Sequence, residues 1–326
     1  MAYKNILPLN EYELIEWVAE SYGLVVDGVD LRVGYMSTVA ILSTSTQRFV
    51  LKCVVQKEDT QLALSRQITL AAGLRNHFMP VADCVMGKGR QYFFEIDKKI
   101  LSLWTFLVGS GFEIGNQKQL QFAGATLGKM HRVFAHEQGD KSGTTWGWSD
   151  RVAQMTHSWQ AMATDNGQGK ALVANLSKYL DKWVSPSEKE PQIMIHNDFR
   201  AQNLLFHGNE ISGILDLDAV CISPRIWDVV YALAFFQAVI ADRPLQVNEM
   251  AALLKGYHDH NPLDKNDLAD LPQWLGLALL KGLTLWGQIC YVDKVQPNVQ
   301  KWLDGYLPLL EQVEVIGGVL QDGLIG

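Results

Sequence analysis

The stretch that decides the fold is His196-Asn-Asp198-Phe-Arg200-Ala-Gln-Asn203-Leu-Leu-Phe206, followed closely by Leu215-Asp216-Leu-Asp218. Apolar runs at 193–195, 204–206 and 214–215 have the length and composition of short buried strands. The polar tetrapeptide at 207–210 contains glycine and asparagine and predicts a hairpin turn between the last two. The sequence therefore predicts strand, loop, short strand, turn and strand.

Three oxygen-bearing side chains fall at defined places in that arrangement. Asp198 and Asn203 are expected on the first loop, and Asp216 at the end of the last strand. Folding of the hairpin brings Asn203 and Asp216 near one another, where two oxygens can hold a hard divalent cation. Mg²⁺ usually takes only one or two protein oxygens and leaves its other positions to phosphate and water. With Asp198 placed to accept a proton from an attacking hydroxyl, these are the parts that phosphoryl transfer requires.

At these residues the chain resembles the kinase superfamily that includes aminoglycoside phosphotransferases, choline kinases and type II homoserine kinases, and protein kinases more distantly. The order of segments is most similar to type II homoserine kinases. The resemblance implies an α+β, two-lobed protein-kinase-like fold. Residues 1–106 would form a small antiparallel-sheet lobe that binds nucleotide, and residues 107–326 a larger, mainly helical lobe for catalysis and substrate binding.

The same resemblance implies roles for individual residues. Asp198 looks like the catalytic base, Asp216 like the main metal ligand and Asn203 like a second metal ligand. Arg200 falls where protein kinases carry the lysine that contacts the transferred phosphate.

The amino-terminal part has the pattern of a small sheet with two helices. A helix is predicted at 11–22, strands at 28–33, 38–42, 48–54, 92–96 and 100–106, and a second helix at 60–74. Lys52 lies near the end of the third strand, and a lysine here holds the nucleotide phosphates in the resembling families. Gly34 and Ser37 bound the segment where their nucleotide-covering loop lies. Gly87–Arg90 predicts a hairpin turn.

One feature departs from the pattern of related kinases, which place a glutamate on the following helix to pair with the lysine. Here the helix at 60–74 contains no acidic residue after Asp59. Three alternatives remain open: Gln67 replaces the glutamate as a neutral hydrogen-bond partner, Glu58 or Asp59 reaches in from the helix start, or Lys52 is held differently.

Conspicuous residues of the second half have structural interpretations. His131 is expected to be packed or capping, and His196 to brace the loop through backbone hydrogen bonds. Asp228 is suited to cap a buried helix at 229–240 and tie it to the loop.

Two further features of this half resemble parts of a binding site. Trp146 and Trp148 lie on a polar loop, where they either line a substrate pocket or anchor the loop, and anchoring is favoured. The Gly124-x-x-x-Gly128-Lys129 sequence lies mid-helix, is one residue too short and lacks the final Ser/Thr, so it is no P-loop.

Composition excludes several classes of partner. The net charge of −7 and pI near 5.6 argue against nucleic acid. No signal peptide is evident, and the most apolar stretch is too short to span a bilayer, so no membrane partner is expected. Four well-separated cysteines without a Cys-x-x-Cys pair predict free thiols in the cytoplasm: Cys53, Cys84, Cys221 and Cys290. The oligomeric state is unknown from the sequence.

These features predict an ATP- and Mg²⁺-dependent kinase that transfers the γ-phosphate to a small-molecule hydroxyl. A compact amino alcohol such as homoserine or choline is the expected acceptor. An aminoglycoside phosphotransferase is the main alternative and would favour an acid-lined pocket. Residues 225–326 carry 12 acidic against 7 basic side chains, a mild and scattered excess that decides little.

Two alternatives come from other classes. A catalytically silent kinase-like binding protein is favoured by the missing helix glutamate and disfavoured by Asp198, Asn203 and Asp216. A metal-dependent hydrolase could use as ligands His196, Asp198, Asp216 and His207, but His207 falls in the predicted turn and no second cluster completes a two-metal site.

Overall fold

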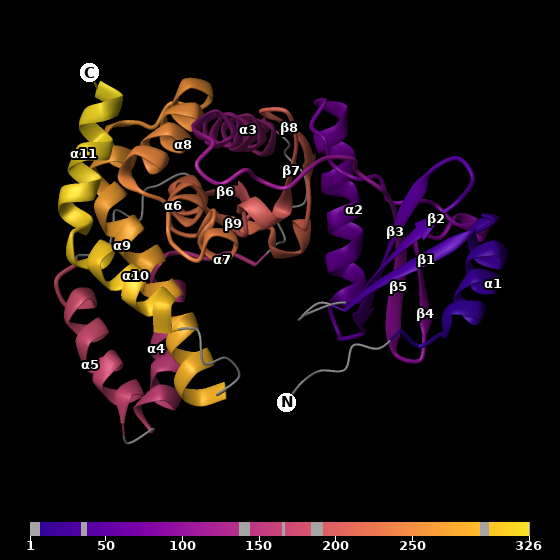
Figure 1. Ribbon diagram of the computed structural model, residues 1–326, viewed down its shortest axis with the longest axis horizontal. Coiled ribbons are helices and arrows are strands. Elements are labelled where there is room, and N and C mark those ends of the chain that lie inside the picture. Colours follow the sequence, from indigo (N-terminus) through magenta and orange to yellow (C-terminus); the bar gives the residue numbers. More distant parts are fainter. Residues whose placement is uncertain are drawn as a thin grey trace. The chain divides into compact units, whose positions relative to one another are not determined.

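The structure, a computed structural model, describes residues 7–33, 38–136, 144–164, 167–183, 192–293 and 300–325. It divides into two compact units (Figure 1). Unit 1 comprises Met1–Val108 with Gly213–Asp218, and unit 2 comprises Gly109–Ser212 with Ala219–Gly326. Gly34 and Ser37, expected around the nucleotide-covering loop, lie outside the described residues.

Unit 1 is built on an antiparallel sheet whose strand order is β1-β2-β3-β5-β4. Its elements are α1 (Glu11–Tyr22), β1 (Gly28–Val33), β2 (Thr38–Ser43), β3 (Arg48–Val55), α2 (Thr60–Asn76), η1 (Lys88–Arg90), β4 (Phe93–Ile96) and β5 (Lys99–Thr105). Each predicted helix and strand is confirmed to within two residues at either end. In β3, Leu51 and Cys53 are buried in the core, so Lys52 between them points to the opposite face.

The prediction of a hairpin turn at Gly87–Arg90 was wrong. This segment forms the single turn η1, and the β4–β5 hairpin instead closes at Asp97 and Lys98. Both residues have positive φ, 47° and 59°, which a two-residue turn needs to match the twist of its strands. Because neither is glycine or asparagine, the usual sequence signal for such a turn is absent.

Unit 2 is mainly helical. Its elements are α3 (Gln117–His136), α4 (Trp148–Ala163), α5 (Gln168–Leu180), β6 (Gln192–Ile195), η2 (Ala201–Asn203), β7 (Leu204–His207), β8 (Glu210–Ile214), η3 (Leu217–Ala219), β9 (Cys221–Pro224), α6 (Arg225–Phe235), α7 (Ala238–Ala241), α8 (Val247–His260), α9 (Lys265–Gln288), the π-helix η4 (Ile289–Asp293), α10 (Gln300–Glu311) and α11 (Val313–Ile325). The end of β8 and the start of η3 belong to unit 1. The predicted hairpin is confirmed, since β7 and β8 pair around a turn at 208–209.

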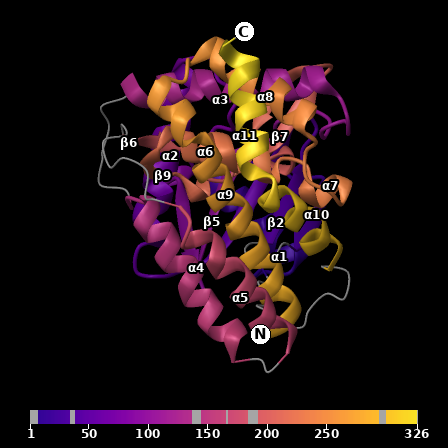
Figure 2. The same ribbon diagram turned by 90° about the vertical axis from the view of Figure 1, so that its left-hand side faces the viewer.

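The centre of unit 2 is α9, which packs against α4, α6, α10 and α11 (Figure 2). Residues 265–293 form one helix that is long and apolar enough, by length and composition, to cross a membrane. However, 61% of its apolar window is buried inside the structure. Its apolar character is therefore that of a core helix.

The buried helix predicted at 229–240 is broken at Phe236, so α6 and α7 are separate helices. The break has a structural use, because the backbone carbonyl of Phe236 accepts a hydrogen bond of 2.9 Å from the backbone N–H of Ala201. Ala201 begins η2, the turn that carries Asn203. The end of α6 is thereby tied to the polar loop after β6.

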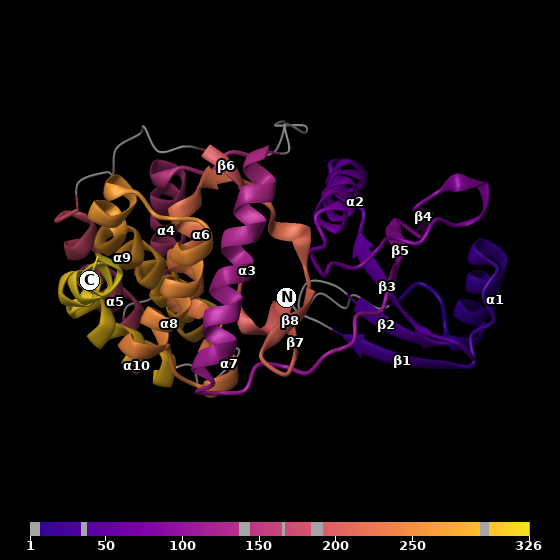
Figure 3. The same cartoon turned by 90° about the horizontal axis from the view of Figure 1, so that it is seen from above.

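Two glycines set the close packing of α3 against α8 (Figure 3). A Cβ added to Gly124 would lie 1.9 Å from the carbonyl oxygen of Leu253, and one added to Gly256 would lie 2.0 Å from that of Gln121. Any larger side chain would force the two backbones apart. Gly124 thus serves helix packing, which agrees with rejecting the P-loop interpretation.

Candidate active site

In unit 1, Lys52 lies among two carboxylates and an amide, a group called here the Lys52 cluster (Lys52, Gln67, Asp216 and Asp218). The Nζ atom of Lys52 is 3.5 Å from Oδ1 of Asp216 and 3.2 Å from Oδ1 of Asp218. Gln67, which is buried on α2, donates from Nε2 to the same oxygen of Asp218. The carboxylates remain open to solvent, with 44% and 47% of their side-chain surface exposed.

This geometry answers the question raised by the missing glutamate. Lys52 is held differently, by Asp218 and Asp216, and Gln67 contributes indirectly by fixing Asp218. Burial lowers the pKa of Lys52, but the two carboxylates outweigh it and the pKa is raised. Lys52 therefore carries its positive charge throughout the neutral range.

Asp216 lies two residues beyond the end of β8, with a positive φ of 61°. The left-handed region is uncommon for a residue other than glycine, so the surrounding structure must hold it there. A bond of 2.7 Å from the backbone N–H of Ile214 to the carbonyl of Pro80 fastens the preceding strand within unit 1. The prediction of a strand running to Asp216 was wrong by these two residues.

In unit 2, the carboxylate of Asp198 is held by three neighbours. The hydroxyl of Tyr231 donates to Oδ1 over 2.7 Å, and Nδ2 of Asn203 donates to Oδ2 over 2.8 Å. Nε of Arg200 lies 3.2 Å from Oδ1. Burial and the charge of Asp198 raise the pKa of Tyr231 well above its usual value, so this hydroxyl stays protonated and donates. Asp198 thus has a fixed orientation.

Asn203 and Asp216, the two expected metal ligands, each have a side-chain oxygen available for an ion. The amide nitrogen of Asn203 also donates to the backbone carbonyl of Asp198 over 2.9 Å. Its Oδ1 has no hydrogen-bond partner among the described residues, and neither has Oδ2 of Asp216. No group of three or more His, Cys, Asp or Glu side chains suited to a metal occurs in the described ranges. Each of these oxygens, one in unit 2 and one in unit 1, is a donor of the kind that Mg²⁺ binds, and Mg²⁺ usually takes only one or two protein oxygens.

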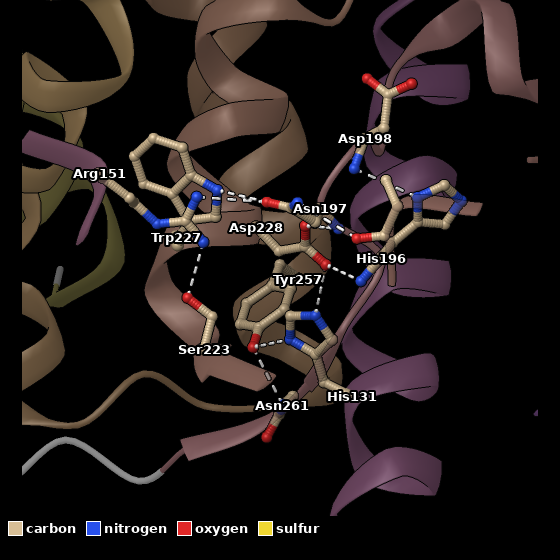
Figure 4. Close-up of polar contacts among 11 residues, drawn as sticks. His131, Arg151, His196, Asn197, Asp198, Ser223, Trp227, Asp228, Tyr257 and Asn261 are labelled. Carbon is tan, nitrogen blue, oxygen red and sulfur yellow. Dashed lines mark hydrogen bonds and ion pairs between the residues drawn. The ribbon is translucent and has the colours of Figure 1, made fainter. Parts of the chain in front are cut away.

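The loop that carries Asp198 is braced by a buried network around Asp228 (Figure 4). Oδ2 of Asp228 accepts from Nε2 of His131 at 3.0 Å and from the backbone N–H of His196 at 2.7 Å. Oδ1 accepts from the backbone N–H of Asn197 at 2.7 Å. The ring of His196 in turn accepts from the backbone N–H of Asp198 at 3.3 Å. Figure 4 shows the Asp198 carboxylate pointing away from this network.

The structural interpretations of these residues are confirmed except in one respect. His131 and His196 are fully buried, and His196 braces the loop through backbone hydrogen bonds. Asp228 ties α6 to the loop, but it does not cap the helix, because the N-cap position is occupied by Pro224. Burial raises the pKa of Asp228, and the hydrogen bond from His131 with those of the loop outweighs it, so the pKa is lowered.

The two tryptophans, Trp146 and Trp148, make contacts that hold their segment in place, as the favoured alternative predicted. Trp148 is the first residue of α4 and packs edge-to-face on Trp274 with 5.2 Å between ring centroids. The backbone carbonyl of Trp146 accepts from the hydroxyl of Ser223 at 2.6 Å. These contacts fit the anchoring alternative.

Comparison with known proteins places the chain in a family. Residues 29–264 match the APH phosphotransferase enzyme family. The chain belongs to this family. A homoserine kinase from Rhodopseudomonas palustris is 30% identical over 258 residues, covering 77% of this chain and 74% of that protein. A homoserine kinase from Zymomonas mobilis is 27% identical over 183 residues, covering 56% and 55%.

Solved structures of the same fold confirm the two-lobed kinase-like class. A microcompartment-associated aminopropanol kinase aligns with a TM-score of 0.72 at 17% identity, covering 95% of this chain and 99% of that one. An amicoumacin kinase, solved in complex with AMP-PNP, Ca²⁺ and Ami, aligns with a TM-score of 0.69 at 16% identity, covering 96% of this chain and 94% of that one. This APH-family protein is a small-molecule phosphotransferase that acts on an alcohol group.

Two residues of the site were not assigned roles from the sequence. Asp218 contacts Lys52 and follows Asp216 by two positions, so the Asp-x-Asp spacing was a usable signal. Tyr231 contacts Asp198 from an apolar helix, and no local pattern distinguishes it from the core residues beside it.

Proposed function

We propose that this chain is an ATP- and Mg²⁺-dependent kinase that transfers the γ-phosphate to the hydroxyl of a compact amino alcohol such as homoserine or choline. The observation that carries the proposal is the carboxylate of Asp198, held at both oxygens by Tyr231, Asn203 and Arg200. The sequence relatives named as homoserine kinases and the aminopropanol kinase structure support this acceptor class.

In the proposed reaction, Asp198 orients the acceptor hydroxyl and takes its proton as the hydroxyl oxygen bonds to phosphorus. The bond from the γ-phosphorus to the bridging oxygen breaks, and the nucleoside diphosphate leaves. Arg200 is a second catalytic residue, whose guanidinium offsets charge on the transferred group. Tyr231 and Asn203 keep the carboxylate in one orientation. Because the base is already aligned with the acceptor hydroxyl, the barrier to phosphoryl transfer is lower.

On the nucleotide side, Lys52 steadies the phosphates, and Gly34 and Ser37 belong to the covering loop. Asn203 and Asp216 would supply oxygen ligands to Mg²⁺, and the ion would neutralise charge that develops on the phosphates. The lobe at 1–106 is proposed as the nucleotide-binding part and 107–326 as the catalytic and substrate-binding part. We further propose a cytoplasmic enzyme that acts without nucleic-acid or membrane partners.

An ATP-consumption screen over amino alcohols, sugars and aminoglycosides tests the proposal, with Asp198→Asn as the decisive variant. The amide keeps the shape but takes no proton, so turnover should fall by about 10²–10⁴-fold while Mg-ATP affinity changes little. Asp259→Asn is a matched control, because among the described residues this acid forms an ion pair with Lys255 alone, on the surface of α8.

The screen also separates the alternatives. Spectinomycin phosphotransferase shares the fold with a TM-score of 0.65, so a preference for aminoglycosides would favour an antibiotic phosphotransferase. Protein that binds Mg-ATP but phosphorylates nothing would favour a silent binding protein. Turnover that survives Asp198→Asn would contradict the mechanism itself.

A further inference from the structure

A second cation lies beside Asp198, on the core helix α9. The Nζ atom of Lys281 is 4.8 Å from the ring centroid of Tyr231 and 5.2 Å from that of Trp227. Tyr231 is the residue whose hydroxyl donates to Asp198. The ammonium of Lys281 is therefore held on an aromatic wall next to the proposed base.

Lys281 has no carboxylate partner among the described residues, within the 4 Å that defines an ion pair. The Asp198 carboxylate already serves Tyr231, Arg200 and Asn203, and that of Asp228 serves His131 and two backbone amides. The side chain is half-buried, so water only partly compensates its charge. A cation kept in such a place gains free energy when an anion approaches.

A buried guanidinium on α4 adds to the positive charge of this region. Arg151 stacks on Trp227, with its Cζ 3.8 Å from the ring centroid, and it is almost fully buried. Its guanidinium donates hydrogen bonds to neutral groups, the Ser223 hydroxyl at 2.8 Å and the Asn197 side-chain oxygen at 3.3 Å. Two cations therefore lie near the ring of Trp227, Arg151 from α4 and Lys281 from α9.

The pKa of Lys281 reflects these surroundings. Burial, followed by the like charge of Arg151, lowers the pKa of Lys281 to about 8. Asp198 and Cys221 oppose this change, and Arg200 adds to it; Tyr231 is the remaining titratable neighbour. A bound anion would raise this pKa again, which couples anion binding to the protonation of Lys281.

We infer that Lys281 is a specificity-determining residue that binds a carboxylate of the acceptor, so that the substrate is a small hydroxy acid. The inference rests on the proposed function and narrows it, because choline and aminoglycosides carry positive charge and no carboxylate. A quaternary ammonium would bind through aromatic rings, but Lys281 already lies near the rings of Trp227 and Tyr231, and Arg151 stacks on that of Trp227, so a further cation there would meet like charge.

The test compares L-homoserine with its carboxamide, 1-amino-2-propanol and choline as acceptors for the wild type, Lys281→Met and Lys281→Arg. A charge-assisted contact predicts that Lys281→Met raises the KM for L-homoserine by about 10- to 100-fold and leaves the KM for ATP unchanged. The KM for the carboxamide should not change in the same variant. Thermal denaturation of each variant checks that it folds.

The pH profile gives a readout that a purely structural lysine would not move. For L-homoserine, kcat/KM of the wild type should fall as pH rises through about 8, because Lys281 loses its proton. Lys281→Arg stays charged and should retain kcat/KM to higher pH. Titration of the substrate itself is common to both proteins and cancels in their ratio.

Two results would overturn the inference alone: an unchanged KM for L-homoserine in Lys281→Met, or a wild type that prefers the carboxamide or choline. If no acceptor is phosphorylated, the proposed function fails instead. Calorimetry of L-homoserine with AMP-PNP and Mg²⁺ then still decides the inference, since binding that is lost in Lys281→Met supports it and absence of binding to the wild type overturns it.

Discussion

The Lys52 cluster and the Asp228 network contain similar groups in opposite surroundings. Asp216 and Asp218 hold Lys52 with 44% and 47% of their side chains exposed. Asp228 is fully buried, and hydrogen bonds from His131, His196 and Asn197 reach both of its oxygens. In the Lys52 cluster, carboxylate oxygens remain accessible to solvent. In the Asp228 network, both carboxylate oxygens accept hydrogen bonds from within the unit.

The difference separates charges kept for a ligand from charges kept for the fold. Exposed ion pairs contribute little to stability, because water competes for both partners. A buried carboxylate costs much to desolvate, and removal of one partner leaves the others unsatisfied. The comparison therefore predicts that substitutions in the Lys52 cluster change activity, and that substitutions at Asp228 change stability.

Asp216→Asn should show the largest effect on activity. Loss of a metal-ligand charge is expected to lower turnover by on the order of 10³-fold, since the ion supplies several kcal/mol to the transition state. The thermal midpoint should stay within a few degrees. Near-normal turnover at millimolar Mg²⁺ would show that Asp216 is not a metal ligand. It would also contradict the idea that charges in the Lys52 cluster serve a ligand.

Asp228→Asn should show the opposite pattern. The amide loses the charge and presents N–H groups to existing donors, so the free energy of unfolding should fall by roughly 3–5 kcal/mol. Urea denaturation followed by circular dichroism measures this change. Asp259→Asn on the surface should be nearly neutral, and equal stabilities of the two variants would show that the network is dispensable.

Lys52→Ala should weaken Mg-ATP binding by about 10- to 100-fold, because a charge-assisted contact to phosphate is lost. Gln67→Ala should have a smaller effect, since Gln67 acts on Lys52 only through Asp218. Isothermal titration with AMP-PNP measures both affinities. Equal and negligible effects would mean that Lys52 is a surface residue with no role in nucleotide binding.

The smallest effect concerns the pH dependence of the Asp228 contribution. Its pKa is lowered by folding, so its stabilisation is present above the unfolded pKa of about 3.9 and is lost as pH falls through the folded value. The difference in unfolding free energy between the wild type and Asp228→Asn should therefore narrow below about pH 4. A difference that widens on acidification would contradict the lowered pKa.

Much of the local structure could be predicted because it follows from short-range rules. The alternation in β2 and β3, the stripe of α1 and the turn at 208–209 depend on neighbours a few positions away. The β4–β5 turn was missed for the same reason, since Asp97 and Lys98 adopt positive φ without glycine. Local rules fail where the rest of the sheet imposes the conformation.

The candidate site divides in the same way. The sequence by itself determined the kinase-like motif, with Asp198, Asn203 and Asp216 at fixed offsets around a hairpin. Only the tertiary structure decided which side chains surround them. Lys52 and Asp218 are 166 positions apart, and Tyr231 follows Asp198 by 33. Spacing within one helix or strand specifies a face of that element, whereas a contact between elements depends on how their faces pack, which no local pattern encodes.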